Sequence, residues 1–174
     1  AYLSFDVHSY GGRNFYLPLW WITSSDILFS HTSPYLGREL TIEEMSNSRQ
    51  VNFVNRRDFC IAFLGKAYPL RLHAIEALSR IQKVKVLGDA ARKTRFTVAH
   101  SKAIAARTYK FVFCFENDLF PGYVTEKVFE AWATGAIPLY WGSDPMGYIN
   151  EKAVINLSKF SDLDTFVEFV REIE

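Results

Sequence analysis

Apolar runs typical of buried strands alternate with segments of helical periodicity along most of the chain. The apolar runs occupy residues 59–64, 84–87, 110–115, 136–141 and 153–156. The helical segments occupy residues 69–81, 100–107, 124–134 and 163–173. Because strands and helices that alternate in this way form βαβ units, the pattern predicts an α/β fold with a mainly parallel sheet.

Several single residues refine these bounds. Phe166, Phe169 and Val170 recur at helical spacing, so we expect them to share the buried face of the last helix. Gly135 suits the C-terminal cap of the preceding helix. Pro138 lacks a backbone N–H, so it must lie where no ladder hydrogen bond is needed, either where its strand begins or at a sheet edge.

Residues 1–50 do not keep this alternation and are expected to be largely irregular. One helix start is expected at Thr41, because Thr41 and Glu44 match a capping box, which is worth about 1 kcal/mol of helix stability. We expect residues 1–50 to be a linker together with the remnant of a preceding domain. Residues 51–174 are expected to form the α/β domain.

Composition narrows the possible partners. The chain is 49% hydrophobic and 22% charged, which suffices for a buried core. Lys and Arg number 20 and Asp and Glu 19, so no overall basic field exists to attract nucleic acid, and any anion site must be local. No apolar stretch approaches the ~20 residues that span a bilayer. Cys60 and Cys114 lie in apolar runs without metal-binding spacing, so we expect two buried, reduced thiols and no metal site.

The densest group of polar residues, 115–127, lies between an expected strand and an expected helix. In open α/β sheets, ligands bind beyond the carboxyl ends of the strands, where helix N-termini offer unpaired N–H groups to anions. Lys127 could hold a diphosphate there, and Glu126 could accept hydrogen bonds from ribose or sugar hydroxyls. Asn117 could bind hydroxyls or a base edge, and Tyr123 could stack on a ring or bind a phosphate oxygen. Together these residues suit a nucleotide sugar.

A purely structural role for the same segment stays open. Loops before helices collect Asn, Asp and Thr as caps, and the charged residues could form a surface ion pair. A direct pair between Glu126 and Lys127 is not expected, because adjacent helical residues point to different faces.

The order of residue types in this region resembles the signature of glycosyltransferase family 10, the α-1,3/4-fucosyltransferases. The segment reads Phe115-Glu116-Asn117, then Gly122-Tyr123-Val124-Thr125-Glu126-Lys127, then Ala131, Gly135, Ile137-Pro138 and Trp141-Gly142. The resemblance implies the C-terminal, Rossmann-like domain of a two-domain GT-B glycosyltransferase. It also implies that GDP-fucose is bound by Asn117, Tyr123, Glu126 and Lys127, with Lys127 facing the diphosphate.

The family also has an arginine on the helix after the first strand of this domain, and Pro69-Leu70-Arg71 resembles that position. A guanidinium near a helix start can fork onto phosphate oxygens and stabilise charge on the departing nucleotide. The alternative is that Arg71 is an exposed helical arginine without a ligand.

The resemblance further implies inverting transfer of L-fucose to a hydroxyl of N-acetylglucosamine or glucose in an oligosaccharide acceptor. Residues 5–13 and 17–21 resemble the end of the family's acceptor-binding domain, so its general base, a glutamate, is expected upstream of residue 1. Asp6, His8 and Glu116 are conceivable bases for which we expect structural roles instead. The α/β domain is expected to be incomplete at its C-terminus, no cofactor or metal is expected to be required, and the isolated chain should transfer fucose poorly.

Two other hypotheses remain. A non-catalytic nucleotide- or protein-binding module of flavodoxin-like shape would show no selectivity for guanine nucleotides and would tolerate Lys127→Ala. A related two-domain glycosyltransferase with another nucleotide sugar would be recognised by competition with UDP or ADP. Bacterial members of the family work in the cytoplasm or at the periphery of the inner membrane, whereas animal members are Golgi proteins with disulfides. The two cysteines form no obvious disulfide framework, which favours the bacterial setting.

Overall fold

The computed structural model describes residues 1–20, 55–88 and 105–174. The helix start expected at Thr41 and most of the helix expected at residues 100–107 lie outside the described residues. No helix in the described ranges is long and apolar enough to cross a membrane.

Within the described ranges, five parallel strands form the central sheet. They are β3 (Asp58–Phe63), β4 (Lys85–Leu87), β5 (Tyr109–Phe115), β6 (Ile137–Trp141) and β7 (Ile155–Asn156). Their order across the sheet is β4-β3-β5-β6-β7, and every pairing is parallel. This is one of the common doubly wound orders of α/β domains. The predicted α/β fold with a parallel sheet is therefore confirmed.

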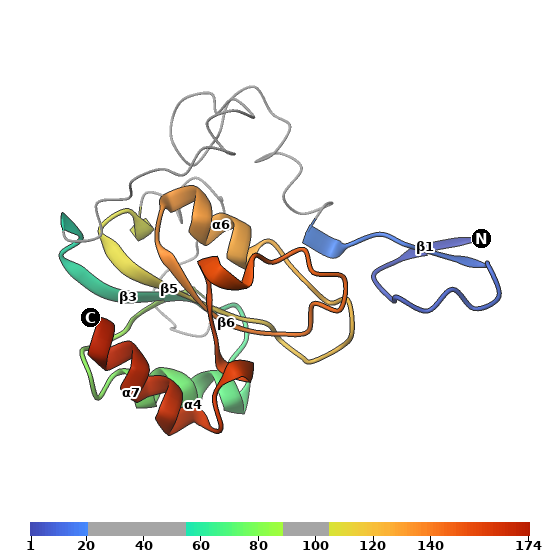
Figure 1. Ribbon diagram of the computed structural model, residues 1–174. Coiled ribbons are helices and arrows are strands. Elements are labelled where there is room, and N and C mark those ends of the chain that lie inside the picture. The colour runs from blue at the N-terminus through green and yellow to red at the C-terminus, as the bar shows by residue number, and fades with distance from the viewer. Residues whose placement is uncertain (21–54, 89–104) are drawn as a thin grey trace.

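Side chains of β5 alternate between two hydrophobic cores, one on each face of the sheet. Phe111, Phe113 and Phe115 belong to the core that includes buried residues of α4 (Pro69–Leu78) and α7 (Leu163–Ile173). Val112 and Cys114 belong to the core that includes buried residues of α6 (Lys127–Thr134). Figure 1 shows the same division, with α4 and α7 below the sheet and α6 above it. The apolar runs of the sequence are continuous because both faces of this sheet are covered.

Two predicted helix bounds differ by three residues: α4 ends at Leu78 and not at residue 81, and α6 begins at Lys127 and not near residue 124. The backbone N–H of Thr125 donates to the Glu116 carboxylate at 2.8 Å, so residues 124–126 form a loop tied to a side chain. Gly135 ends α6 in the left-handed conformation with a φ of 74°, as its C-cap role predicts.

Two other expectations were right in part. Pro138 is the second residue of β6, which is an interior strand, and pairing with β7 begins only at Leu139, so the proline lies where the strand begins. Phe166 and Val170 are buried on the inner face of α7, as expected. Phe169 is 39% exposed, and Val167 is buried in its place.

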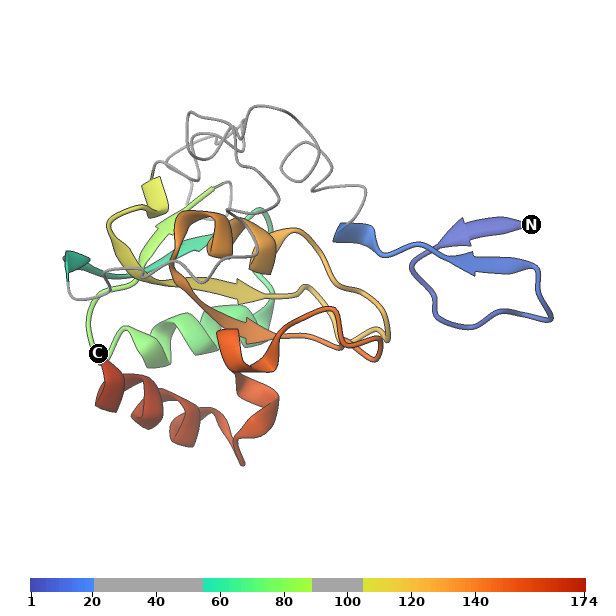
Figure 2. The same ribbon diagram turned by 45° about the horizontal axis from the view of Figure 1, so that its top comes forward.

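Residues 1–20 form what we call the N-terminal arm, which projects from the body in both ribbon views (Figures 1 and 2). The arm contains a parallel pair of short strands, β1 (Tyr2–Ser4) and β2 (Asn14–Tyr16), where the sequence predicted irregular structure. Three-residue strands are too short to show period-two alternation, which explains the miss.

The N-terminal arm contacts the body through the loop that precedes α6. The Tyr16 hydroxyl donates to the Gly122 carbonyl at 3.2 Å, and the backbone N–H of Trp20 donates to the Val124 carbonyl at 2.9 Å. The ring of Phe5 meets the ring of Tyr123 edge to face, with centroids 5.4 Å apart.

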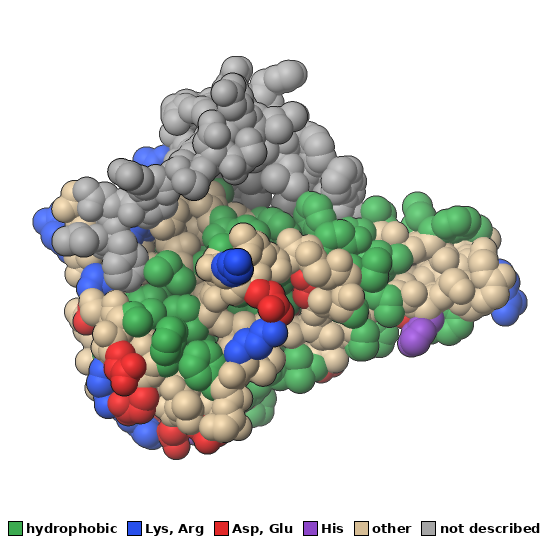
Figure 3. Space-filling model, in the orientation of Figure 1, with side chains coloured by type: hydrophobic (Ala, Val, Ile, Leu, Met, Phe, Trp, Pro, Cys, Tyr) green, Lys and Arg blue, Asp and Glu red, His purple; other side chains and the backbone are tan. Residues whose placement is uncertain are grey.

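Figure 3 shows hydrophobic side chains on both the body and the arm, while charged side chains gather over the region of α7.

Candidate functional site

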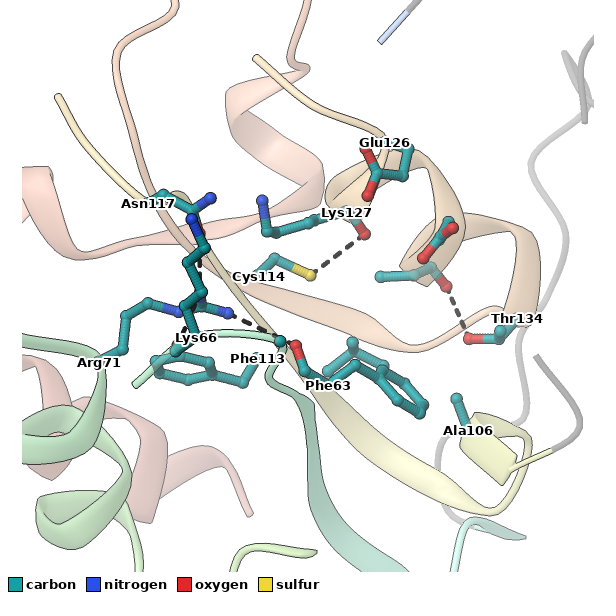
Figure 4. A pocket seen from close by; sticks show the side chains of 14 residues that line it. Phe63, Lys66, Arg71, Ala106, Phe113, Cys114, Asn117, Glu126, Lys127 and Thr134 are labelled. Atoms are coloured by element: carbon teal, nitrogen blue, oxygen red, sulfur yellow. Dashed lines mark hydrogen bonds between the residues drawn. The ribbon is translucent and has the colours of Figure 1, made fainter. Parts of the chain in front are cut away.

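The connections of the sheet create a topological switch point between β3 and β5. The chain passes from β3 through α4 to β4 on one side, and from β5 through α6 to β6 on the other. A ligand crevice is expected outside the carboxyl ends of the strands at such a point. A cavity of about 260 Å³ lies there, and its walls include Phe63 at the end of β3, Arg71 of α4 and Lys127 of α6 (Figure 4).

Arg71 is buried in this wall, with 3% of its surface exposed, so it is not the exposed helical arginine of the alternative interpretation. Its Nη1 donates to Asn117 Oδ1 at 2.8 Å and to the Lys66 carbonyl at 3.5 Å, and its Nη2 donates to the Phe63 carbonyl at 3.5 Å. Its Nε is buried without a hydrogen-bond partner among the described residues. Burial lowers the pKa of the guanidinium, and the nearby Glu116 carboxylate opposes that shift. A bound anion would therefore lie beside a guanidinium that is held in place by hydrogen bonds and whose Nε–H has no acceptor within the described residues.

Asn117 links two of the residues that the sequence singled out. Its Oδ1 accepts from Arg71, and its Nδ2 donates to the Tyr123 hydroxyl at 3.4 Å. Asn117 follows the carboxyl end of β5, whereas Tyr123 lies in the loop before α6. The three side chains therefore form one hydrogen-bonded chain across the mouth of the crevice.

Lys127 is held by a buried network. Its Nζ donates to Glu116 Oε2 at 2.5 Å and to Thr125 Oγ1 at 2.9 Å. Glu116 is completely buried, and its Oε1 also accepts from Thr125 N and Oγ1, both at 2.8 Å. Glu116 thus has the structural role that we expected, as the anchor of the loop before α6.

Gly142 shows why the motif has a glycine after β6. A Cβ at this position would lie 2.2 Å from the Tyr140 hydroxyl oxygen and 2.9 Å from Glu116 Cγ. The backbone therefore passes directly over the buried carboxylate, and only glycine leaves room for it.

Lys127 and Glu126 occupy the start of α6 without forming the cap and surface pair of the structural alternative. Glu126 is the N-cap residue but has helical dihedrals and makes no side-chain cap hydrogen bond. Lys127 pairs with buried Glu116 and not with Glu126, in agreement with the expectation that the two neighbours point apart. Since the first N–H groups of a helix lack intrahelical acceptors, this uncapped end favours an anion in the adjoining cavity.

The structure brings four of the five predicted site residues to one cavity. Arg71, Asn117, Glu126 and Lys127 line it directly, whereas Tyr123 reaches it only through its bond to Asn117 and lines a neighbouring groove with Phe5 and Phe120.

Two charged residues of the cavity were not predicted, Lys66 and Glu130. Lys66 belongs to a Gly-Lys pair just after β3, and its place at the carboxyl end of a strand was the signal that could have identified it. Glu130 lies one helical turn after Glu126, so the helix period could have placed it on the same face.

Other polar candidates have local structural roles. The Asp6 carboxylate accepts from the Tyr10 hydroxyl at 2.5 Å and from the His8 N–H at 2.9 Å, and these bonds lower its pKa. Asp162 begins the one Asp-x-Asp triplet of the sequence, but it caps α7 by accepting from Thr165 N at 2.8 Å and does not line the cavity. Cys60 and Cys114 are buried free thiols, as expected.

A doubly wound parallel sheet, with cationic and amide side chains and a helix N-terminus around its switch point, defines an α/β domain suited to a phosphorylated ligand. The sequence model of "Glycosyltransferase family 10 (fucosyltransferase) C-term" matches residues 28–174. The chain belongs to this family.

Known relatives agree with this assignment. The chain is 32% identical over 104 residues to the α-(1,3)-fucosyltransferase FucT of Helicobacter pylori, a match that covers 59% of this chain and 22% of that protein. It is 36% identical over 66 residues to an α-(1,4)-fucosyltransferase of Arabidopsis thaliana, covering 37% of this chain and 16% of that protein. The matched segments are thus less than a quarter of either relative.

The fold also matches a solved structure. The crystal structure of an α1,3-fucosyltransferase with GDP-fucose superimposes with a TM-score of 0.72 at 23% identity, over 98% of this chain and 56% of that one. The match shows that the chain has the fold of the corresponding part of a GT-B fucosyltransferase.

Proposed function

We propose that this chain carries the donor-binding part of an inverting α-1,3/4-fucosyltransferase. The donor is GDP-fucose, and the acceptor is a hydroxyl of N-acetylglucosamine or glucose in an oligosaccharide. The observation that carries the proposal is the convergence of Arg71, Asn117 and Lys127 around one cavity at the switch point of the sheet. This is where the fold class binds nucleotides, and the charges suit a diphosphate.

Each residue has a role that its contacts allow. Arg71 and the start of α6 bind the diphosphate, because Arg71 Nε is unused and the helix N-terminus is uncapped. Lys127 adds positive charge at the same place, although its charge is partly balanced by Glu116. Glu126 is half-buried in the cavity wall and accepts hydrogen bonds from ribose or sugar hydroxyls.

In the transfer step, the acceptor oxygen attacks the anomeric carbon of fucose while the bond to the β-phosphate oxygen breaks. The attacking hydroxyl needs a base, and the departing GDP needs positive charge to stabilise its new negative charge. Arg71 and Lys127 supply the second requirement in an environment where most of their surface is shielded from water. We assign no residue of this chain as the base, and we propose that donor binding needs no metal.

The named relatives support assigning the donor to this chain. One is named for α-(1,3) and the other for α-(1,4) transfer, so their products differ in linkage, whereas both transfer fucose by name. The transferred sugar is therefore common to both names, which supports fucose as the sugar of the donor.

Calorimetric titration of the chain with GDP tests the proposal, with UDP and ADP as competitors. Glu126→Ala is a suitable site variant, since no side-chain hydrogen bond ties Glu126 to the fold. Glu172→Ala, an exposed position on α7, is the matched control. We expect selective GDP binding that weakens about tenfold in Glu126→Ala, the loss of one hydrogen bond to a charged group, and stays unchanged in Glu172→Ala.

The outcomes separate the hypotheses. Equal binding of GDP, UDP and ADP would support a nucleotide-binding module without guanine selectivity, and preferred UDP or ADP would indicate another sugar donor. Transfer is tested separately with GDP-fucose and a glycan that ends in N-acetylglucosamine. We expect this chain alone to bind the donor but to transfer fucose poorly, and efficient transfer would show that the base lies within these residues.

A further inference from the structure

In the part of the chain that the structure describes, Lys66 is the cavity-lining cation whose ammonium group takes part in no ion pair or hydrogen bond within the fold. The Lys127 ammonium is ion-paired with buried Glu116, and the Arg71 guanidinium is held by Asn117 and two backbone carbonyls. Lys66, by contrast, has an exposed side chain at the cavity wall. Figure 4 shows its ammonium group and that of Lys127 pointing to the same side, with Asn117 beside them.

The backbone of Lys66 contacts Arg71 in the cavity wall, while its side chain is exposed. Its carbonyl accepts from Arg71 Nη1 at 3.5 Å, which ties the loop after β3 to the same wall. A lysine on such an anchored loop can bring three N–H donors to an anion without any change in the backbone.

Lys66 contributes a positive charge that faces the cavity. Among the described residues, three cationic side chains line the cavity: Lys66, Arg71 and Lys127. Because Glu116 pairs with Lys127, loss of Lys66 would remove one of the positive charges of this wall that no ion pair with a described carboxylate offsets. A diphosphate would then be attracted less strongly to a partly buried site, where charges interact more strongly than in water.

We infer that Lys66 is a phosphate-binding residue that gives the site its preference for a nucleoside diphosphate over an unphosphorylated nucleoside. The inference rests on the proposed function, in which the cavity holds the diphosphate of a nucleotide sugar. Lys66 contacts a non-bridging phosphate oxygen from the exposed side of the cavity. In the transfer step the same ammonium lies near the oxygen that receives negative charge when the sugar leaves.

The test is calorimetric titration of the 174-residue chain with GDP and with guanosine, at two ionic strengths. The variants are Lys66→Ala, Lys66→Arg and the matched control Lys83→Ala, an exposed lysine between α4 and β4 at the opposite edge of the sheet. We expect Lys66→Ala to weaken GDP about tenfold, the loss of one charge-assisted hydrogen bond. Guanosine affinity should stay the same, and Lys66→Arg should retain most of the GDP affinity.

The dependence of GDP affinity on ionic strength distinguishes phosphate binding by Lys66 from a purely structural role, which would leave this dependence unchanged. Because screening weakens interactions between charges that water can reach, the loss of Lys66 should reduce the salt dependence of GDP binding. Unchanged GDP affinity in Lys66→Ala, or an equal loss for GDP and guanosine, would overturn the inference while leaving the proposed function intact. Failure of the unmodified chain to bind GDP would overturn the proposed function, and this inference with it.

Discussion

The buried pair of Glu116 and Lys127 predicts a large, partner-dependent loss of stability. Lys127→Met removes the ammonium 2.5 Å from Glu116 Oε2 and leaves a fully buried carboxylate with only the donors of Thr125. Breaking a buried ion pair from one side costs about 3–5 kcal/mol. The Lys127 side chain is 19% exposed, so water relieves part of that penalty, and we expect a loss of about 3 kcal/mol.

A double variant separates the buried charge from the rest of the effect. In Lys127→Met with Glu116→Gln, the neutral amide oxygen still accepts from Thr125 while the uncompensated charge is gone, so at least about 2 kcal/mol should return. Lys159→Met is the matched control, because its pair with Glu151 is exposed and should contribute less than about 1 kcal/mol. Urea denaturation followed by circular dichroism measures all of these free energies. If the single and double variants were equally unstable, the buried charge would not be the cause.

Three further predictions follow from single positions. Gly122→Ala should destabilise the folded chain more than Gly147→Ala. Both glycines have positive φ, but only at Gly122 would a Cβ come within 2.6 Å of the Phe5 carbonyl oxygen. Thermal unfolding of the two variants compares them directly. Arg56→Met should cost about 2–3 kcal/mol in urea denaturation, since Arg56 donates to three backbone carbonyls; exposed Arg57→Met is the control, and equal effects would contradict the assignment. The two buried thiols should resist alkylation until the chain unfolds. Burial raises the pKa of both thiols in the folded state. Their contribution to the free energy of unfolding is therefore complete below the ordinary thiol pKa of about 8.5, and above it declines by up to about 1.4 kcal/mol per pH unit for each thiol. Urea titrations between pH 8 and 10 would detect this decline.

The sequence predicted the central strands well because β3, β5 and β6 are buried on both faces. Such strands have continuous apolar runs, and β5 differs from its predicted bounds by one residue. The start of α6 was missed by three residues, because the backbone N–H of Thr125 is taken by the Glu116 side chain nine residues earlier. No local pattern encodes such a bond between distant residues.

The site residues were predicted by a resemblance more than by physical pattern. Asn117 and Lys127 lie at the end of a strand and the start of a helix, where general rules already point. The burial of Arg71 could not be predicted, since an arginine in the first turn of a helix is usually exposed. Lys66 was missed because one lysine in a loop has no periodicity, and its position just after the carboxyl end of β3 was the only local signal.

Tyr123 belongs to two parts of the molecule at once. Its ring touches Phe5 of the N-terminal arm, and its hydroxyl accepts from Asn117 at the edge of the cavity. Movement of the arm would therefore change the position of a residue that is hydrogen-bonded to the cavity-lining Asn117. Such coupling is reciprocal at equilibrium. If contact of the arm with the body raises the affinity for nucleotide by some factor, bound nucleotide must raise the equilibrium constant for that contact by the same factor. Tyr123 would then couple the position of the N-terminal arm to the binding of nucleotide in the cavity.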